Sequence, residues 1–348
     1  MAIADGSGAR SCQEPRCTPV ELPARRTERN CSIERTVNIL SDAWAFLVTR
    51  EAFFGARRFE QFRSALDIPR NTLIDRLQRL TSEGILRRAS YSGTSLRVEY
   101  RLTRSGIDLY PTFIALMQFG DRWLADEENA PLRLIHEQCN QTCKPMVSCS
   151  HCLHLVNAES VEYRNGAGAA GKQIQPVRRS RRNHDGFLRG RPSSVSRALD
   201  VIGDRWSFLV IREAFFGVCR FDKLQAELGI ASNVLADRLK HLVERGIFEK
   251  QRYHTERERY NYRLSPMGLE LYGPIILMMA WGDRWRAGGR PPLLLKHSGC
   301  GHDFIPLAIC DQCNAPIDAT SMKYQLRYSF GRMTLSQRVI ASQRAITM

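Results

Sequence analysis

The sequence predicts two tandem copies of a mainly α-helical domain with short β-hairpins, an α+β class of fold. WAFLVTREAFFG (44–55) recurs as WSFLVIREAFFG (206–217), with 10 of 12 residues identical. NTLIDRLQRLTSEGIL (71–86) recurs as NVLADRLKHLVERGIF (233–248), again 162 residues further along the chain. A repeat of that length is a duplicated domain. Within each copy, apolar residues at helical spacing are followed by two alternating, basic segments that predict a hairpin.

The order of helices in the first copy is that of a helix-turn-helix. Apolar residues predict a first helix beginning near Ile33 and a second that ends at Gly55. A third short helix over 59–66 and a break at 67–69 precede a fourth, amphipathic helix that Gly84 terminates. A short helix, a tight turn and an amphipathic helix are typical of this motif.

The fourth helix and the hairpin after it predict a winged helix that binds DNA. The hairpins span 85–102 and 247–264, and basic side chains on such a wing can grip phosphates beside the groove that the helix enters. The candidate DNA-binding residues are Arg70, Asn71, Arg76, Gln78, Arg79, Arg87, Arg88, Arg97, Ser232, Asn233, Arg238, Lys240, His241, Lys250, Arg252, Arg257 and Arg259. An ordinary solvated helix face is the alternative, and Asp75 and Asp237 are expected to pair with a neighbouring arginine.

A long helix follows each hairpin. Thr103 and Ser265 are predicted hydroxyl caps, and the helices they open are expected to run to Ala125 and Ala287. These helices are more apolar than one small domain needs, so part of each is expected to pack against another copy.

Composition favours a polyanionic partner, and the lack of a targeting or membrane-spanning segment predicts a reducing compartment. The 348-residue chain has a net charge of +15, which suits nucleic acid or an anionic membrane surface. The sequence shows neither a membrane-spanning apolar run nor a signal peptide, so a cytoplasmic location is expected. Eleven cysteines in that compartment indicate metal or redox chemistry rather than structural disulfides.

A His-x-x-Cys pair and a Cys-x-x-Cys pair follow each long helix. Two such pairs suit a closed tetrahedral zinc site, so we expect one Zn²⁺ in each repeat and no catalytic metal. The predicted ligands are His136, Cys139, Cys149 and Cys152 in the first repeat, and His297, Cys300, Cys310 and Cys313 in the second. Competing ligands are Cys143, His151, His154 and His302. The alternative is a thiol-rich segment whose spacing was inherited through the duplication.

The remaining segments lack an apolar period. The predicted domains are a disordered lead (1–30), a winged-helix domain with its cluster (31–156), a basic flexible linker (157–192), a second such domain (193–320) and a basic tail (321–348). The stretch from Lys172 to Arg191 alone carries a charge of +6. It is either a DNA-binding arm or a solubilising spacer.

Each copy resembles an HxlR-type winged-helix transcriptional regulator over 31–126 and 193–288. The resemblance rests on Cys-Ser-Ile-Glu-Arg-Thr (31–36), the duplicated Trp-to-Gly helices and the Ile-x-x-Asn-x-Leu-x-Asp-Arg-Leu segments (68–77 and 230–239). It implies cytosolic bacterial DNA-binding proteins that dimerise through their terminal helices. It also implies a redox-sensing cysteine at Cys31, where the second copy has Ser193. A buried small residue is the alternative reading of Cys31.

The leading hypothesis is a sequence-specific DNA-binding transcriptional regulator, a repressor, whose two recognition helices act as a covalent pseudo-dimer on double-stranded DNA. A homodimer of chains with four winged helices is also open. The alternative is a protein-interaction module that uses the winged helices and zinc knuckles without DNA. The sequence has no nucleophile–base pairing, phosphate loop or cofactor fingerprint, so no enzyme activity is expected, and a small-molecule effector cannot be identified.

Overall fold

The computed structural model describes residues 31–40, 42–90, 98–125, 130–169, 190–254 and 259–327. The first repeat contains α1 (Ser32–Leu40), α2 (Ala43–Phe53), α3 (Phe59–Leu66), α4 (Arg70–Ser82), β1 (Leu86–Ser90), β2 (Val98–Leu102), α5 (Arg104–Ile107), α6 (Tyr110–Leu124), β3 (Leu132–His136), β4 (Gln141–Cys143), β5 (Pro145–Cys149) and β6 (Val161–Asn165). The second contains α7 (Ser194–Ile202), α8 (Arg205–Phe215), α9 (Phe221–Leu228), α10 (Ser232–Glu244), β7 (Phe248–His254), β8 (Arg259–Leu264), α11 (Pro266–Leu269), α12 (Tyr272–Arg286), β9 (Leu293–His297), β10 (Asp303–Phe304), β11 (Pro306–Cys310) and β12 (Met322–Leu326).

The predicted winged helix-turn-helix is present in both repeats. The turn between α3 and α4 begins at Asp67 in the left-handed conformation, and Gly229 has the same conformation between α9 and α10. Each wing is an antiparallel hairpin that starts by pairing Leu86 with Leu102, or Phe248 with Leu264. The apolar face of α4 is buried through Leu73, Leu77 and Leu80, which leaves its polar face outside.

The single long helix expected after each wing is in fact two helices. Thr103 and Ser265 cap the short helices α5 and α11, as predicted. The chain then turns and starts again as α6 and α12. Pro111 and Pro274 lie in the first turn of the second helix, where the missing N–H and the ring would disrupt a continuous helix.

The two repeats pack on each other through an approximate two-fold relationship. Helix α12 lies against α1 of the other repeat, and α6 lies against α7 in the same way. The helices approach closely at Gly282 and Gly120. A Cβ atom there would lie 2.4 Å from the Ser32 carbonyl oxygen and 2.1 Å from that of Ser194. The expectation that the long helices pack against another copy is therefore met within the chain by the second repeat.

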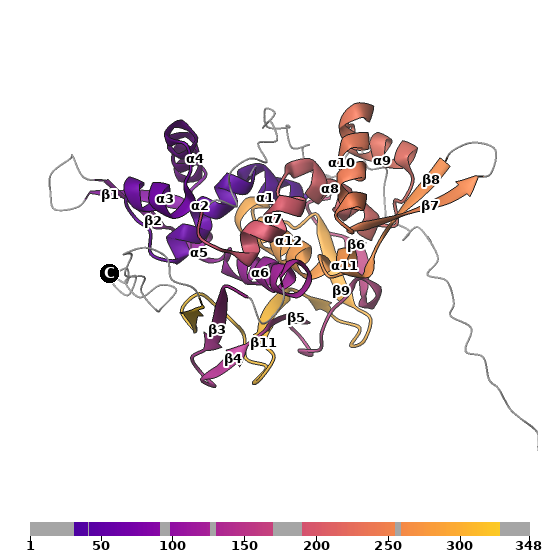
Figure 1. The fold of residues 1–348 in the computed structure, drawn as a ribbon. Helices are drawn as coiled ribbons and strands as arrows, with labels where there is room; N and C mark the ends of the chain where they lie inside the picture. The colour runs from indigo at the N-terminus through magenta and orange to yellow at the C-terminus, as the bar shows by residue number, and fades with distance from the viewer. Residues whose placement is uncertain are drawn as a thin grey trace, which may run out of the picture.

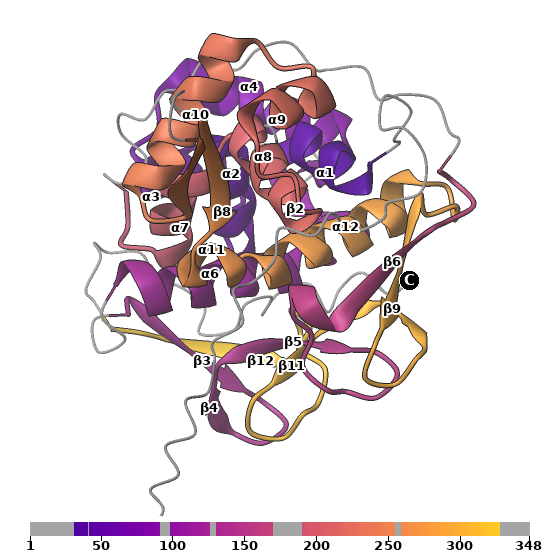
Figure 2. The same ribbon diagram turned by 90° about the vertical axis from the view of Figure 1, so that its right-hand side faces the viewer.

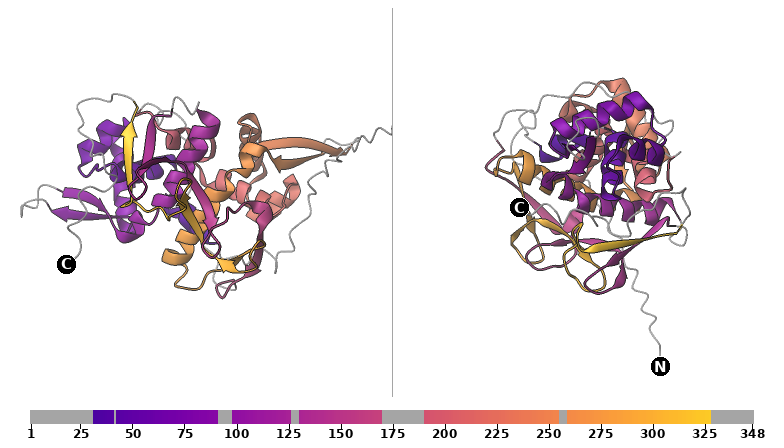
Figure 3. Two further views of the ribbon diagram at one scale, coloured as in Figure 1. Left: turned by 90° about the horizontal axis from the view of Figure 1, so that it is seen from below. Right: turned by 90° about the vertical axis from the view of Figure 1, so that its left-hand side faces the viewer.

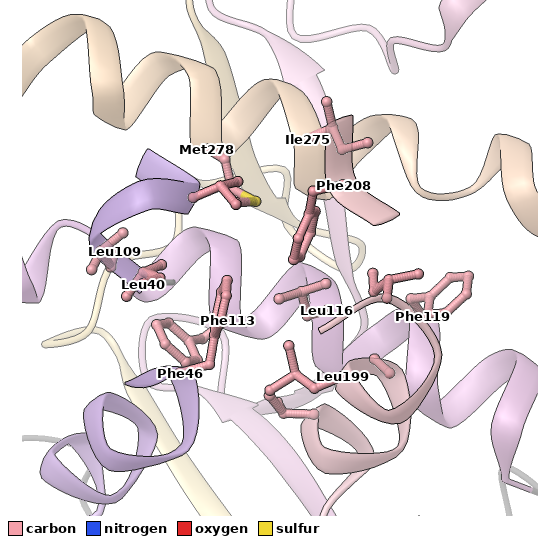
Figure 4. Packing of buried hydrophobic residues seen from close by; sticks show 14 of the residues in the cluster. Leu40, Phe46, Leu109, Phe113, Leu116, Phe119, Leu199, Phe208, Ile275 and Met278 are labelled. Atoms are coloured by element: carbon pink, nitrogen blue, oxygen red, sulfur yellow. The ribbon is translucent and has the colours of Figure 1, made fainter. Parts of the chain in front are cut away.

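The apolar core is continuous across this boundary. Phe46 and Phe208 occupy equivalent positions in the two repeats, and their rings stack with centroids 5.7 Å apart. Figure 4 shows that side chains from both repeats surround them, including Phe113 and Met278. Burial of this shared surface holds the repeats together, because apolar area removed from water stabilises by about 25 cal/mol per Å².

The strands that follow α6 and α12, namely β3 to β6 and β9 to β12, form a lobe. In it, strands of one repeat pair with strands of the other. Strand β5 pairs with β11 about the central pair Val147 and Ala308, which are equivalent residues. Strand β3 pairs with β12, and β9 pairs with β6, so each of these ladders also joins the two repeats. Figure 2 shows this lobe beneath α6 and α12.

Two predicted boundaries are wrong because of these ladders. Strand β6 lies inside the expected linker (157–192), and β12 lies inside the expected tail (321–348). Each is five residues long and carries polar side chains, which is too weak a pattern to identify alone. Their partners are in the other repeat, and no local pattern reveals such pairing. The rest of the linker (170–189) and tail (328–348), and the lead (1–30), lie outside the described residues.

The arrangement places the recognition helices on one side and the strand lobe on the other. Figure 1 shows α4 and α10 at the top of the molecule and β3, β4, β5 and β11 at the bottom. Seen from below, the two wings extend from opposite ends (Figure 3). Within the described residues, no helix is both long and apolar enough to cross a bilayer.

Candidate DNA-reading surface and metal-ligand clusters

The recognition helices α4 and α10 present the polar faces that could meet DNA. On α4 the exposed candidates are Arg70, Asn71 and Gln78. On α10 they are Ser232, Asn233 and Lys240. The Asn side chains occupy equivalent positions, whereas the other two pairs differ in charge or length. Asn, Gln, Arg and Lys are the residue types that pair with base edges in the major groove.

Arg76 and Arg238, which were predicted to contact DNA, are held in ion pairs within the protein. Arg238 is only 8% exposed. Its Nε donates to Asp204, and its Nη1 donates to Asp237. Arg76 makes the equivalent ion pairs with Asp42 and Asp75. Burial lowers the pKa of the Arg76 guanidinium, but the two carboxylates outweigh burial and the net pKa is raised.

The partners Asp42 and Asp204 were not singled out from the sequence. Each is the N-cap of the helix before the helix-turn-helix, and each accepts hydrogen bonds from backbone N–H groups of α2 or α8. An Asp immediately before an apolar helix was the available signal. Because the same carboxylate also binds the recognition-helix arginine, it ties α4 or α10 to the centre of the molecule.

Arg79 and His241 are also turned inward. Arg79 donates to the Asn38 carbonyl at 2.5 Å, and the His241 ring nitrogen lies 3.1 Å from the Val201 carbonyl. Both side chains therefore contact the helix that precedes α2 or α8 in the same repeat. Both are partly buried, and their predicted contacts with DNA stay predictions.

The wings carry exposed basic residues. Arg87 and Arg88 lie exposed on β1, and the exposed candidates on β7 and β8 are Lys250, Arg252 and Arg259. The Lys250 ammonium lies 3.7 Å from the centre of the Tyr260 ring. Arg97 and Arg257 lie outside the described residues, so their predicted phosphate contacts stay predictions.

The eight predicted metal ligands form two four-residue clusters. Cluster A consists of His136, Cys139, Cys310 and Cys313. Cluster B consists of Cys149, Cys152, His297 and Cys300. In each cluster the candidate ligand atoms all lie within 4.8 Å of one another. The ligand set is thus three thiols and one imidazole in both.

The expectation of one site within each repeat is wrong. Both clusters combine the His-x-x-Cys pair of one repeat with the Cys-x-x-Cys pair of the other. The reason is the pairing of β5 with β11, which carries each Cys-x-x-Cys turn toward the other repeat. Sequence spacing shows which residues form a pair of ligands, but it cannot show which two pairs meet.

All four ligand pairs lie on the same kind of turn. The N–H of the residue after the second ligand donates to the carbonyl of the first ligand, over 2.7 to 2.9 Å. That residue has positive φ at Asn140, Leu153, Gly301 and Asn314. The conformation is unusual for a leucine, since its Cβ disfavours the left-handed region. The geometry therefore holds the two ligands of each pair close together.

The distances suit a tetrahedral ion. Around Zn²⁺, the usual bond lengths place two sulfurs about 3.8 Å apart, and a sulfur and a nitrogen about 3.6 Å apart. The Sγ atoms of Cys139 and Cys310 are 3.9 Å apart, and so are those of Cys149 and Cys300. Cys313 Sγ lies 3.3 Å from His136 Nδ1. These separations also far exceed a disulfide bond.

The competing ligands lie beside the clusters in different ways. Cys143 is buried near Cys310 and Asp311, close to cluster A. His151 and His302 stack with ring centroids 3.6 Å apart near Cys300 of cluster B, and both are exposed. His154 belongs to none of the ligand groups found in the described residues.

Cys31 lies immediately before α1 and is partly buried. It lies close enough to Arg212 of the other repeat to affect that guanidinium. Burial lowers the pKa of Arg212, but Cys31, Glu213 and Glu34 outweigh it and raise the net pKa. Ser193, the counterpart of Cys31 in the second repeat, caps α7 by accepting a hydrogen bond from the Ser196 N–H. The sensor role implied for Cys31 stays a prediction.

The two helix-turn-helix motifs, their exposed polar helices and their basic wings define a DNA-binding transcription regulator of the winged-helix class. The family described as HxlR-like helix-turn-helix matches residues 39–128 and again 201–289. The chain belongs to this family and carries two copies of its domain.

The chain is also similar to regulators from several organisms. It is 44% identical over 131 residues to an uncharacterized HTH-type transcriptional regulator of Mycobacterium tuberculosis, covering 37% of this chain and 82% of that protein. It is 39% identical over 106 residues to another from Synechocystis, covering 30% and 78%. A third, YvaP of Bacillus subtilis, is 32% identical over 92 residues, covering 26% and 85%. Each relative is named a transcriptional regulator.

Proposed function

We propose that the chain is a sequence-specific repressor that binds double-stranded DNA in the cytoplasm as a covalent pseudo-dimer. The observation that carries this proposal is the placement of α4 and α10 on one side of the molecule, related by the same approximate two-fold that relates the repeats (Figure 1). Two-fold related recognition helices match half-sites one helical turn apart, or a multiple of it. One chain then supplies both winged-helix domains that are needed to bind two half-sites.

The half-sites should form an imperfect palindrome. Asn71 and Asn233 are equivalent and would contact the same base in both halves. The position of Arg70 is occupied by Ser232 in the second repeat, and that of Gln78 by Lys240. Arg pairs best with guanine and Gln with adenine, so these positions should differ in preference between the halves. Arg79 and His241, which also differ, are excluded from this argument because they face inward.

Selection of bound duplexes from a random pool tests the proposal. The expected result is a site with two related halves at fixed spacing, bound with an affinity that falls steeply as salt rises. Repression is tested by placing that site over the promoter of a reporter gene, where expression should fall when the protein is present. Enrichment of no duplex would favour the protein-interaction alternative, and a rise in reporter expression would indicate an activator.

Zn²⁺ is the ion that best suits clusters A and B. Three thiolates and one imidazole make a closed tetrahedral set, and such sites are structural because no ligand position stays open. Metal analysis of protein purified under reducing conditions should give about two zinc ions per chain, one for each cluster. A competing ion with hard oxygen preferences, such as Mg²⁺, should not be retained.

A further inference from the structure

We propose that each zinc ion is shared between the repeats, so that the two ions crosslink the two halves of the chain. The crosslinks would fix the separation of the two recognition helices, α4 and α10. The crosslink itself depends only on the composition of clusters A and B. Its effect on DNA binding rests on the proposed function.

The sharing follows from the strand ladders. Cys149 ends β5, Cys310 ends β11, and these strands run antiparallel with Val147 opposite Ala308. The two Cys-x-x-Cys turns therefore leave the ladder in opposite directions. Each meets the His-x-x-Cys turn that follows β3 or β9 of the other repeat.

The ions would add a connection at the side of the molecule remote from the recognition helices. Near α4 and α10, the repeats are joined by the packing of α1 on α12 and of α7 on α6. Below them, α6 and α12 rest on β5 and β11 (Figure 2). The ladders of the lobe are short, and strands of two to five residues gain little stability by themselves. A thiolate metal site supplies that stability, because ion binding becomes part of folding.

A rigid link between the two winged-helix domains matters when the ligand is a DNA duplex with two half-sites. When two binding modules are held at the separation of their two half-sites, binding of the second is effectively intramolecular, and affinity can rise by 10² to 10⁴. Loosening the link lowers that gain without changing any contact to DNA. Metal content would thus control affinity for the complete site.

Two double variants distinguish shared sites from sites within one repeat. Cys139→Ser with Cys313→Ser removes two ligands of cluster A, one from each repeat, and should leave about one zinc ion per chain. Cys139→Ser with Cys149→Ser removes two ligands of the first repeat but one from each cluster, and should leave none. Sites within one repeat predict the reverse result for both variants, and that reversal overturns the proposal. So does wild-type protein that contains no zinc when kept reduced and free of chelator.

The effect on DNA is tested by removing zinc from the wild-type chain with a chelator under reducing conditions. Affinity for a duplex with both half-sites should fall at least about tenfold, while affinity for a single half-site should change less than about twofold. Equal losses of affinity for both duplexes, or no loss for either, would contradict the role of the ions in fixing the separation of the recognition helices. If the zinc-loaded protein binds neither duplex, the proposed function fails, and the two double variants still decide whether the ions are shared.

Discussion

Asp42 and Asp204 form an antiparallel backbone bridge at the boundary between the two repeats. They are equivalent residues, 162 positions apart, so the approximate two-fold axis passes between them. Each carboxylate also holds the arginine of its own recognition helix, Arg76 or Arg238. The two DNA-reading helices are thereby tied to the same point at the centre of the molecule.

Replacing Arg238 by alanine should reduce stability more than it reduces base specificity. The change leaves Asp204 largely buried without its main cationic partner, and losing one member of such a pair costs about 3 kcal/mol. Denaturant unfolding should report this loss, and the ranking of DNA sequences should stay unchanged. A stable Arg238→Ala protein with altered base preference would return this residue to the reading surface.

Lys240→Ala is the matched change on the exposed face of the same helix. Because Lys240 lies outside the core and pairs only loosely with Glu244, stability should change by less than about 0.5 kcal/mol. If Lys240 contacts a base, affinity should fall by about 1–3 kcal/mol on cognate DNA alone. Equal losses on all sequences would assign it to phosphate instead.

The wing arginines should contribute to affinity without contributing to specificity. We expect Arg88→Ala and Arg252→Ala to weaken binding to every duplex, because phosphate contacts carry no sequence information. The dependence of log affinity on log salt should become shallower by about one unit for each lost contact. Arg63→Ala is the control, since Arg63 is exposed on α3 and is not part of the hairpin. An unchanged slope in the wing variants would remove the hairpins from the interface.

Asp283 should make stability depend on pH. It lies on α12 and accepts a hydrogen bond from Ser32 of α1 in the other repeat. Burial raises the pKa of its carboxyl to about 6, although the Ser32 hydroxyl and the Arg35 charge act in the opposite direction. The folded protein therefore holds this proton more tightly than the unfolded chain does. Its contribution to stability is present below about pH 4 and is lost as pH rises toward 6.

Asp283→Asn tests that dependence while keeping the acceptor for Ser32. The variant should be about 1–2 kcal/mol more stable than the parent at pH 7, and the difference should disappear near pH 4. Asp222→Asn, at an exposed carboxylate on α9, serves as the control. A variant that is less stable at pH 7 would show that the charge of Asp283 stabilises the boundary.

Gly282 should tolerate no side chain. A Cβ atom there would lie 2.4 Å from the Ser32 carbonyl oxygen and 2.7 Å from Thr36 Oγ1, so Gly282→Ala must push α12 away from α1. We expect a loss of about 1–3 kcal/mol in thermal or denaturant unfolding. Arg284→Ala, at an exposed position on the same helix, should cost much less. Equal stability of the Gly282→Ala protein and its parent would show that the helices can separate at little cost.

The sequence by itself determined the local parts of this protein. Helical periodicity identified α1 to α4, alternation identified the wings, and a hydroxyl residue identified the starts of α5 and α11. The eight candidate ligands of clusters A and B were also recognisable, because the two members of each pair are only three positions apart in the chain. Each of these signals is contained in a short stretch of chain.

Only the tertiary structure decided how the parts meet. Both repeats carry the same two ligand pairs at the same spacing, so spacing could not show that the Cys-x-x-Cys pair of one repeat joins the His-x-x-Cys pair of the other. It could not identify β6 and β12 either, since these short polar strands depend on partners more than 120 residues away. The sequence also did not show that Arg76 and Arg238 pair with the carboxylates of Asp42 and Asp204. Contacts between distant segments are set by packing of the whole chain, and local sequence carries no record of them.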